Sequence, residues 1–246
     1  MDGFIHIAAA GAKEAMLRQA VNAHNLANAP TIGFKADLAQ AETLYVKGDG
    51  QETRAYNRVG AIGTDFSSGA IQQTGRDLDV AVNGPGWIAV QTGSGVEALT
   101  RRGDLRIDEF GQLLNGAGQQ VMGETGPIAL PPFSSLEIAS DGTISIVPLG
   151  EAPNTVAILD RIKMVNPPQE QLFKNEAGLV QTDDGLPLLA DGSVRLTTGA
   201  LETSNVNATE AMVRMIELSR NFEQFMKLVT VGEEVDTSSS SLMRIQ

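Results

Sequence analysis

Apolar residues recur at helical spacing at both ends of the chain, and this pattern constrains the fold more than any other feature. At the N-terminal end they follow one another at intervals of three or four residues, at Ile5, Ala9, Ala12, Met16, Ala20, Ala23 and Ala27. This spacing is typical of an amphipathic helix, and Ala is the strongest helix former. Pro30 and Gly33 end the pattern. We therefore predict a helix over residues 4–28 whose thin Ala stripe suits close packing against other helices.

A second stripe of the same period predicts another helix over residues 205–230. Asn205 or Asn207 can cap its start, and Glu210 stands three residues after Asn207, as in a capping box. Its apolar stripe consists of Ala208, Met212, Met215, Phe222, Met226 and Val229, and Ile216, Leu218 and Phe225 widen it.

Each terminal helix needs a partner, because an isolated helix of this length is marginally stable in water. Antiparallel pairing of the two helices is the simplest solution. It would still leave an exposed seam of Met, Phe and Ala side chains. We therefore expect the chain to assemble with other subunits, and its free ends to be disordered before assembly.

The middle of the chain alternates with the period of β-strands and is rich in turns. Residues 78–82 (L-D-V-A-V) and 87–91 (W-I-A-V-Q) flank an N-G-P-G turn, which predicts a β-hairpin. Asp141-Gly142 and Asp191-Gly192 each separate two further predicted strands. Short strands that recur in this way are typical of a barrel or a sandwich.

We therefore predict an α+β fold in which paired, coiled-coil-like N- and C-terminal α-helices accompany a central all-β domain. The predicted domains are an N-terminal helix and turn (1–35), an extended or β connector (36–76), a central β-domain (77–200) and a C-terminal helix (201–246).

The composition excludes several classes of function. The formal net charge is −12 and there is no run of Lys or Arg, so we expect no nucleic-acid partner and no binding to an anionic membrane. The absence of cysteine excludes disulfides and thiolate metal sites. We find no apolar run of the length that a membrane span needs and no cleavable signal peptide, so we expect no membrane insertion.

Patterns that would indicate catalysis or a cofactor are also missing. His6 and His24 are both on the first predicted helix, about 27 Å apart, too far to bind one metal ion. The G-P-G sequence at 84–86 is followed by a strand, so it predicts a turn and not a dinucleotide site. No pair of carboxylates stands out as a hydrolase would need. We predict a protein that is not an enzyme, with no cofactor, metal or catalytic residue.

Four segments of the chain resemble the bacterial flagellar axial proteins of the rod and hook class. The first is N-x-x-N-L-A-N-x-x-T-x-G-F-K at 22–35, and the second is T-G-R-D-L-D-V-A-V-N-G-P-G-W at 74–87. T-R-R-G-D-L-R-I-D-E-F-G-Q-L at 100–113 is the third, and 204–223 resembles the C-terminal signature with one extra residue after Asn207. Trp87 stands where the class usually has Phe. The four segments occur in the order of the class and cover nearly the whole chain.

The resemblance implies a structural role in the flagellar basal-body rod. Within the class the chain is most similar to proximal-rod proteins, through the opening M-D-x-x-I and R-N-F-E-Q-F-M-K at 220–227. A distal-rod paralogue is the near alternative. The implied assembly is a tubular drive shaft, built through the terminal helices, that transmits torque and passes exported subunits. The implied partners are copies of the chain, other rod proteins and the flagellar type III export apparatus. The implied location is the periplasm-spanning rod, reached without a cleaved signal peptide.

The subunit interface is predicted on the two terminal stripes and the first motif. Asn22, Asn25 and Asn28 stand about one turn apart and can either cap the helix or contact a neighbour; with the resemblance, we assign them to the interface. The full set is Ile5, Ala9, Ala12, Met16, Ala20, Asn22, Ala23, Asn25, Asn28, Phe34, Ala208, Met212, Met215, Ile216, Phe222, Met226 and Val229. Two other classes remain open: a β-domain binding module with oligomerising helical tails, and a hydrolase that uses Asp and Glu.

Overall fold

The computed structural model describes residues 2–45, 55–152, 154–175, 177–182 and 185–243. The chain divides into two compact units. The helical unit comprises Met1–Ala29, Ala36–Asp65 and Val206–Gln246, and the β-unit comprises Pro30–Lys35 and Phe66–Asn205. The first and fourth stretches that resemble rod proteins, 22–35 and 204–223, each contain a point where the chain passes between the units.

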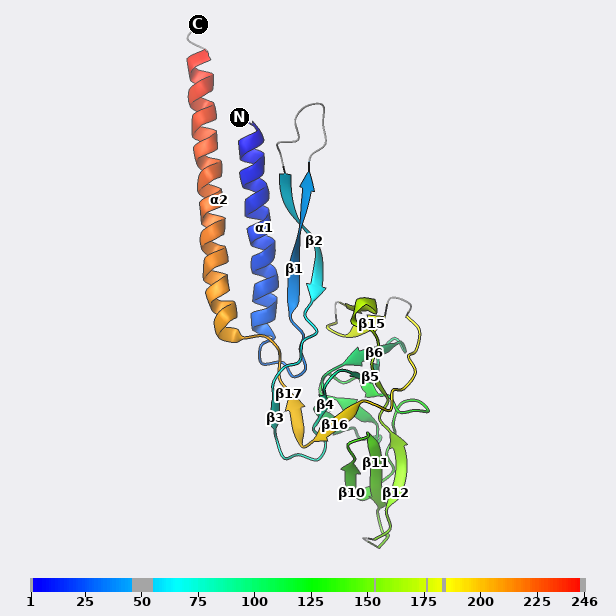
Figure 1. Ribbon diagram of the computed structural model, residues 1–246. Helices are drawn as coiled ribbons and strands as arrows, with labels where there is room; N and C mark the ends of the chain where they lie inside the picture. The colour runs from blue at the N-terminus through cyan, green and yellow to red at the C-terminus, as the bar shows by residue number, and fades with distance from the viewer. Residues whose placement is uncertain (1, 46–54, 153, 176, 183–184, 244–246) are drawn as a thin grey trace. The chain divides into compact units, whose positions relative to one another are not determined.

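The helical unit consists of two long helices and a hairpin. Its elements are α1 (Asp2–Ala27), β1 (Asp37–Tyr45), β2 (Ala55–Thr64) and α2 (Ala208–Met243). The helices run in opposite directions, and α1 lies between α2 and the hairpin (Figure 1). β1 and β2 are antiparallel, with Asp37 opposite Thr64 and Tyr45 opposite Ala55. A register shift between Gln40 and Ala41 interrupts the ladder.

The predicted fold class is wrong about how the elements are arranged, although the chain does contain both α-helices and β-strands as predicted. The helices do not form a coiled-coil-like pair on their own, because the β1–β2 hairpin packs on α1 as a third element. The strands are therefore not confined to one central all-β domain. Residues 37–45 (D-L-A-Q-A-E-T-L-Y) belong to the predicted extended or β connector and form strand β1 of this hairpin. Of the predicted connector, residues 46–54 lie outside the described part of the chain.

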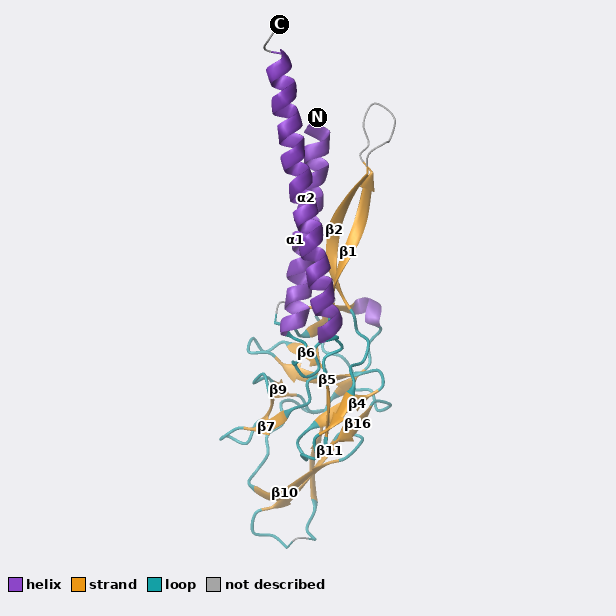
Figure 2. Cartoon of the chain, turned by 90° about the vertical axis from the view of Figure 1, so that its left-hand side faces the viewer, coloured by secondary structure: helices purple, strands orange, loops and turns teal. Residues whose placement is uncertain are grey.

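The β-unit is built from short strands in several sheets (Figure 2). Its elements are β3 (Ile71–Gln73), β4 (Val80–Asn83), β5 (Trp87–Gln91), β6 (Glu97–Thr100), β7 (Leu105–Ile107), β8 (Leu113–Asn115), β9 (Gln120–Val121), β10 (Phe133–Ile138), β11 (Thr143–Pro148), β12 (Ala157–Arg161), β13 (Met164–Val165), the 3₁₀ turn η1 (Gln169–Gln171), β14 (Leu172–Lys174), β15 (Val180–Thr182), β16 (Arg195–Thr198) and β17 (Ala200–Glu202). The largest sheet has eight strands, in the order β14-β15-β6-β5-β9-β8-β7 with β13 on β5.

Two clusters of buried side chains fill the β-unit, and the larger is mainly aliphatic, in keeping with an aromatic content of only 4%. The central strands β4 and β5 are almost wholly buried, and Ile88 and Val90 have no exposed surface. Leu105, Leu113 and Ile144 are also fully buried in the same cluster. Burial of such side chains stabilises the fold by about 2 kcal/mol each.

The hairpin predicted around the N-G-P-G turn is wrong, although both strands and the turn exist. β4 pairs with β16, whereas β5 pairs with β6, β9 and β13. Gly84 and Gly86 have φ values of 81° and 132°, and the turn sends the chain from one sheet into another. The Asp141-Gly142 hairpin is confirmed, since β10 and β11 pair with Ile138 opposite Ile144. Of the two strands predicted around Asp191-Gly192, only the second forms, as β16.

Within the described part of the chain, neither helix combines the length and the hydropathy that a membrane crossing requires.

Candidate assembly surface

Small residues form the seam between α1 and α2. Ala8, Ala12 and Ala15 of α1 are buried, and so is Ala211 of α2. Gly11 lies directly under Phe225, so closely that a Cβ atom at Gly11 would be 2.5 Å from the Phe225 ring. These contacts let the two backbones approach closely. The seam uses a row of α1 residues beside the predicted stripe, since Ala12 is the only stripe position among the three buried alanines.

The three asparagines of α1 make hydrogen bonds within the chain. Asn22 is buried and its Nδ2 donates to the Ala211 carbonyl oxygen at 2.7 Å, which joins α1 to α2. Asn25 Nδ2 donates to the Asp37 carbonyl oxygen and Asn25 Oδ1 accepts from the Asp37 N–H, both at 2.8 Å. Asn28 Nδ2 donates to the His24 carbonyl oxygen at 3.0 Å. These bonds fix α2 and the start of β1 against α1, and a role in subunit contacts stays a prediction.

Apart from the buried Ala12 and the half-buried Ile5, the predicted interface residues of the α1 stripe are exposed. Ala9, Met16, Ala20 and Ala23 are exposed, and Met16 keeps 64% of its surface. These four residues are seven, four and three positions apart, so they follow one side of the helix.

On α2, the predicted interface residues divide between the seam and the surface. Met212, Ile216 and Met226 are exposed, with exposed fractions of 52%, 57% and 44%. The half-buried members are Ala208, Met215, Phe222 and Val229. Phe34, the remaining predicted residue, is buried in the β-unit, where Lys174 Nζ lies 4.0 Å from its ring centre.

Other exposed apolar side chains of the helices are absent from the predicted set. They are Ile7, Leu17, Val213, Leu228, Val231 and Val235. Leu17 extends the α1 stripe to a flanking helical position, whereas Ile7 lies on another side of α1. The seam residues Ala8, Gly11 and Ala15 were missed because small residues line several sides of this Ala-rich helix. Only the packing of α2 shows which of these sides is buried.

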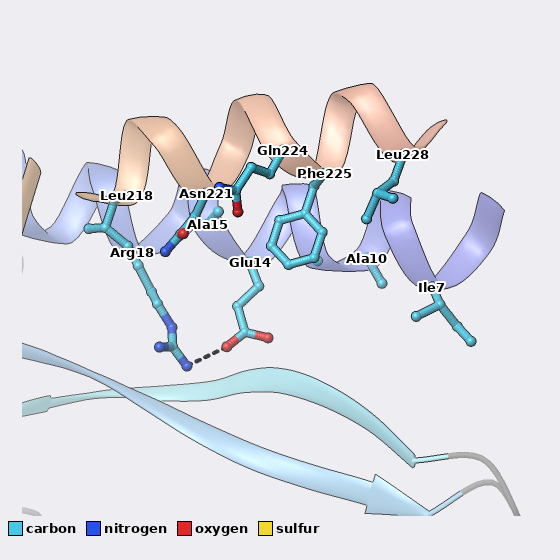
Figure 3. Close-up of a pocket in the computed structure, with 11 residues that line it drawn as sticks. Ile7, Ala10, Glu14, Ala15, Arg18, Leu218, Asn221, Gln224, Phe225 and Leu228 are labelled. Carbon is cyan, nitrogen blue, oxygen red and sulfur yellow. Dashed lines mark hydrogen bonds and ion pairs between the residues drawn. The ribbon is translucent and has the colours of Figure 1, made fainter. Parts of the chain in front are cut away.

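An apolar groove runs between α1 and α2 on the side of the Glu14–Arg18 ion pair (Figure 3). Its volume is about 500 Å³, and the Phe225 ring points into it from α2. Its lining residues are Ile7, Ala10, Gly11, Glu14, Ala15, Arg18, Leu218, Asn221, Gln224, Phe225 and Leu228.

Side chains that could bind a metal ion do not cluster in the described part of this surface. His24 Nδ1 lies 2.8 Å from Asp37 Oδ2, which places one of the two histidines against the hairpin. Among the residues that the structure describes, no group of three His, Cys, Asp or Glu side chains could hold a metal ion. The arrangement therefore fits packing and not a reaction.

Comparison with known proteins identifies the family. Residues 197–242 match the family model of the flagellar basal body rod FlgEFG protein C-terminal region, and residues 81–146 match that of the flagellar hook protein FlgE/F/G D1 domain. The chain is 39% identical to the flagellar basal-body rod protein FlgF of Salmonella typhimurium, over 99% of each chain. It is 40% identical to FlgF of Escherichia coli, over 94% of each chain.

A more distant relative is the flagellar basal-body rod protein FlgG of Bacillus subtilis, which is 31% identical over 92% of this chain and 93% of its own. The two FlgF proteins are thus more similar to the chain than this FlgG protein is. The chain therefore belongs to the flagellar basal-body rod proteins of the FlgF type, and it is a structural component of the rod and not an enzyme.

Proposed function

We propose that the chain enters the proximal rod through the exposed face of its terminal helices. The observation that carries this proposal is the row of exposed apolar side chains on α1 and α2, with Met16, Met212 and Ile216 each more than half exposed. These side chains remain uncovered although the two helices already pack on each other. Copies of the chain and other rod proteins are the proposed partners on this face.

The physical driving force is the removal of apolar surface from water. Burial contributes roughly 25 cal/mol for each Å² of apolar surface, so several half-exposed Met and Ile side chains add a substantial favourable free energy. Exposed apolar surface that follows long helices is expected to mark an interaction site. The small residues Ala9, Ala20 and Ala23 between them allow neighbouring helices to approach closely.

The geometry of such contacts favours an open assembly. The exposed face of one subunit meets a different face of the next, and a heterologous contact that does not close forms a helical tube. In this proposal the helices of many subunits form the wall of a hollow drive shaft. The wall transmits torque, and the lumen passes exported subunits.

For delivery, we propose export through the flagellar type III apparatus into the periplasm-spanning rod, without a cleaved signal peptide. The support for this route is the resemblance of the terminal motifs to the axial proteins. Detection of the intact N-terminal sequence in protein recovered from isolated basal bodies tests it. Recovery of a shortened chain would contradict it.

The assembly proposal is tested by Met212→Asp combined with Ile216→Asp. We expect loss of the chain from isolated basal bodies and loss of swimming in soft agar, because two carboxylates cannot be buried in an apolar contact without a partner. Both positions are exposed, so the fold of the single chain should persist, as the helical band of far-UV circular dichroism will report.

A matched control is Asn221→Asp, which adds a negative charge at an exposed position on the groove side of α2. We expect this variant to swim and to enter the rod. Normal assembly of the Met212/Ile216 double variant would refute the proposed face. Equal defects in the control would show that added charge, and not the surface that carries it, blocks assembly.

A further inference from the structure

Three segments of the β-unit adjoin the points where the chain passes to the helical unit. The chain passes between the units four times, after residues 29, 35, 65 and 205. Residues 30–35, 66–70 and 202–205 therefore form the β-unit ends of all four connections. Their mutual contacts decide how firmly these ends are held.

One buried residue of the third segment, Glu202, bonds to both of the other segments. Glu202 Oε1 accepts hydrogen bonds from Lys35 Nζ at 2.7 Å and from the Gly69 N–H at 2.9 Å. The Glu202 carbonyl oxygen accepts from the Gly33 N–H at 2.8 Å. Lys35 Nζ also donates to the Ser67 carbonyl oxygen at 2.7 Å, which joins the first segment directly to the second.

A second cation ties this cluster to the core of the β-unit. Arg101 Nη1 donates to Glu202 Oε2 at 2.9 Å, and its Nη2 donates to the Gly84 carbonyl oxygen at 2.8 Å. The guanidinium carbon lies 5.2 Å from the centre of the Trp87 ring. Arg101 thus links the connections to the turn between the β4–β16 sheet and the eight-stranded sheet, and to Trp87 at the start of β5.

All three charged side chains are withdrawn from water. The exposed fractions are 2% for Lys35, 1% for Glu202 and 4% for Arg101. One carboxylate therefore pairs with two cations, and removal of its charge would weaken both ion pairs. Buried charges of this kind persist only where they are paired and hydrogen-bonded.

Two glycines allow the segments to approach one another. A Cβ atom at Gly69 would lie 1.9 Å from the Thr203 carbonyl oxygen, and one at Gly33 would lie 2.4 Å from the Arg101 carbonyl carbon. Backbone bonds complete the contact, since the Asn205 N–H donates to the Phe34 carbonyl oxygen at 3.3 Å and the Thr203 N–H donates to the Ala70 carbonyl oxygen at 2.8 Å.

We propose that Glu202 is a junction node that fixes all four connections to the β-unit at one place. Force that passes between the units then reaches the core of the β-unit through a rigid buried cluster and not through independent linkers. This inference does not rest on the proposed assembly face, because it concerns a single chain and can be measured on one.

Amide hydrogen exchange in Glu202→Gln tests the node. Glutamine keeps the shape and an acceptor oxygen but removes the charge that holds Lys35 and Arg101. We expect exchange in segments 30–35, 66–70 and 202–205 to rise together, by roughly tenfold or more as charge-assisted hydrogen bonds are lost. The amides of Gly33, Gly69 and Asn205 report the three segments individually. Exchange in the core strand β5 should not rise with them.

A matched control is Glu97→Gln, which breaks another little-exposed ion pair of the β-unit. Glu97 Oε2 lies 2.8 Å from Lys163 Nζ, and both side chains are 12% exposed. This variant should leave the exchange of the three segments unchanged. A rise in all three segments in this control, or a uniform rise over all strands in Glu202→Gln, would overturn the proposal.

Lys35→Met is a milder variant that decides the question if Glu202→Gln does not fold. It leaves the pair between Glu202 and Arg101 intact but removes the bonds to Ser67 and Glu202. We expect faster exchange at Gly33 and Gly69, with Asn205 following because its N–H bonds the neighbouring Phe34 carbonyl. A change confined to residues next to position 35 would contradict a shared node.

Discussion

Single polar side chains fix the ends of elements in both units. Asn25 holds both backbone groups of Asp37, so the turn that follows α1 returns β1 to the side of the same helix. Asn207 Oδ1 accepts from the N–H groups of Thr209 and Glu210 at 3.1 and 3.3 Å, which confirms it as the cap of α2. Asp141 plays a similar part in the β10–β11 turn, where its two carboxylate oxygens accept from the N–H and the hydroxyl of Thr143.

The Asp141 turn predicts a loss of stability in acid. The backbone and side-chain hydrogen bonds from Thr143, with help from the charge of Arg161, hold the pKa of Asp141 below its ordinary value. A lowered pKa in the folded state means that the carboxylate stabilises the fold above its unfolded pKa, and that this contribution disappears as pH falls through the folded pKa. We expect Asp141→Asn to flatten the fall in melting temperature between about pH 5 and pH 2.

Melting curves recorded by Trp87 fluorescence at several pH values provide the measurement. Thr143→Val is the companion variant, since it removes the hydroxyl donor to Asp141 and should weaken the same dependence less. An unchanged pH dependence in Asp141→Asn would show that the turn makes no contribution in this range.

At the scale of elements, glycines decide where strands turn and how closely they pack. Gly86 combines a φ of 132° with a close neighbour, since a Cβ atom there would lie 2.7 Å from Val194 Cγ1. This glycine lies between β4 and β5, where the chain leaves one sheet for another. The glycine thus serves both the turn and the packing of Val194 beneath it.

Gly86→Ala is therefore expected to destabilise the β-unit by about 1–3 kcal/mol, because Ala at this φ is strained. Chemical denaturation followed by Trp87 fluorescence measures the change beside the substituted residue. Gly93→Ala is the matched control, since no atom lies within 4 Å of a Cβ built at Gly93. We expect the control to unfold like the parent chain, and equal midpoints for both variants would disprove the role assigned to Gly86.

At the scale of the whole molecule, the chain is divided between two cores of different kinds. The helical unit has a seam in which Ala and Gly residues predominate on α1, and it has many exposed apolar residues. The β-unit has a large aliphatic cluster that includes Val80, Ile88 and Leu113, and a smaller cluster around Trp87. A seam of small side chains buries little apolar surface, so it contributes much less free energy than the aliphatic core.

We therefore predict that the isolated chain unfolds in two steps. The helical band of far-UV circular dichroism should be lost at a lower temperature than the fluorescence change of Trp87, the only tryptophan, which lies in the β-unit. Incorporation into rods should raise the first transition, because partners bind the folded helices. Coincident transitions in the isolated chain would mean that the two units unfold as one.

The sequence by itself determined the features that depend on local pattern. Helical spacing located α1 and the start of α2, and Gly and Asp-Gly positions located most turns. The terminal and central motifs indicated the rod family. These predictions succeeded because periodicity, capping and turn chemistry act between residues that are close in the chain.

Only the tertiary structure decided which surfaces meet. It paired β4 with β16 and β5 with β6, and it placed the β1–β2 hairpin with the helices. In the tertiary structure Ala8, Ala12 and Ala15 are buried in the seam, whereas Met16 is exposed. The tertiary structure also brought Lys35, Arg101 and Glu202 together from three distant places in the chain. The physical reason is that the pairing of segments depends on burial and hydrogen bonding between residues that are distant in the chain. A local sequence pattern is compatible with several pairings, and the packed fold contains only one of them.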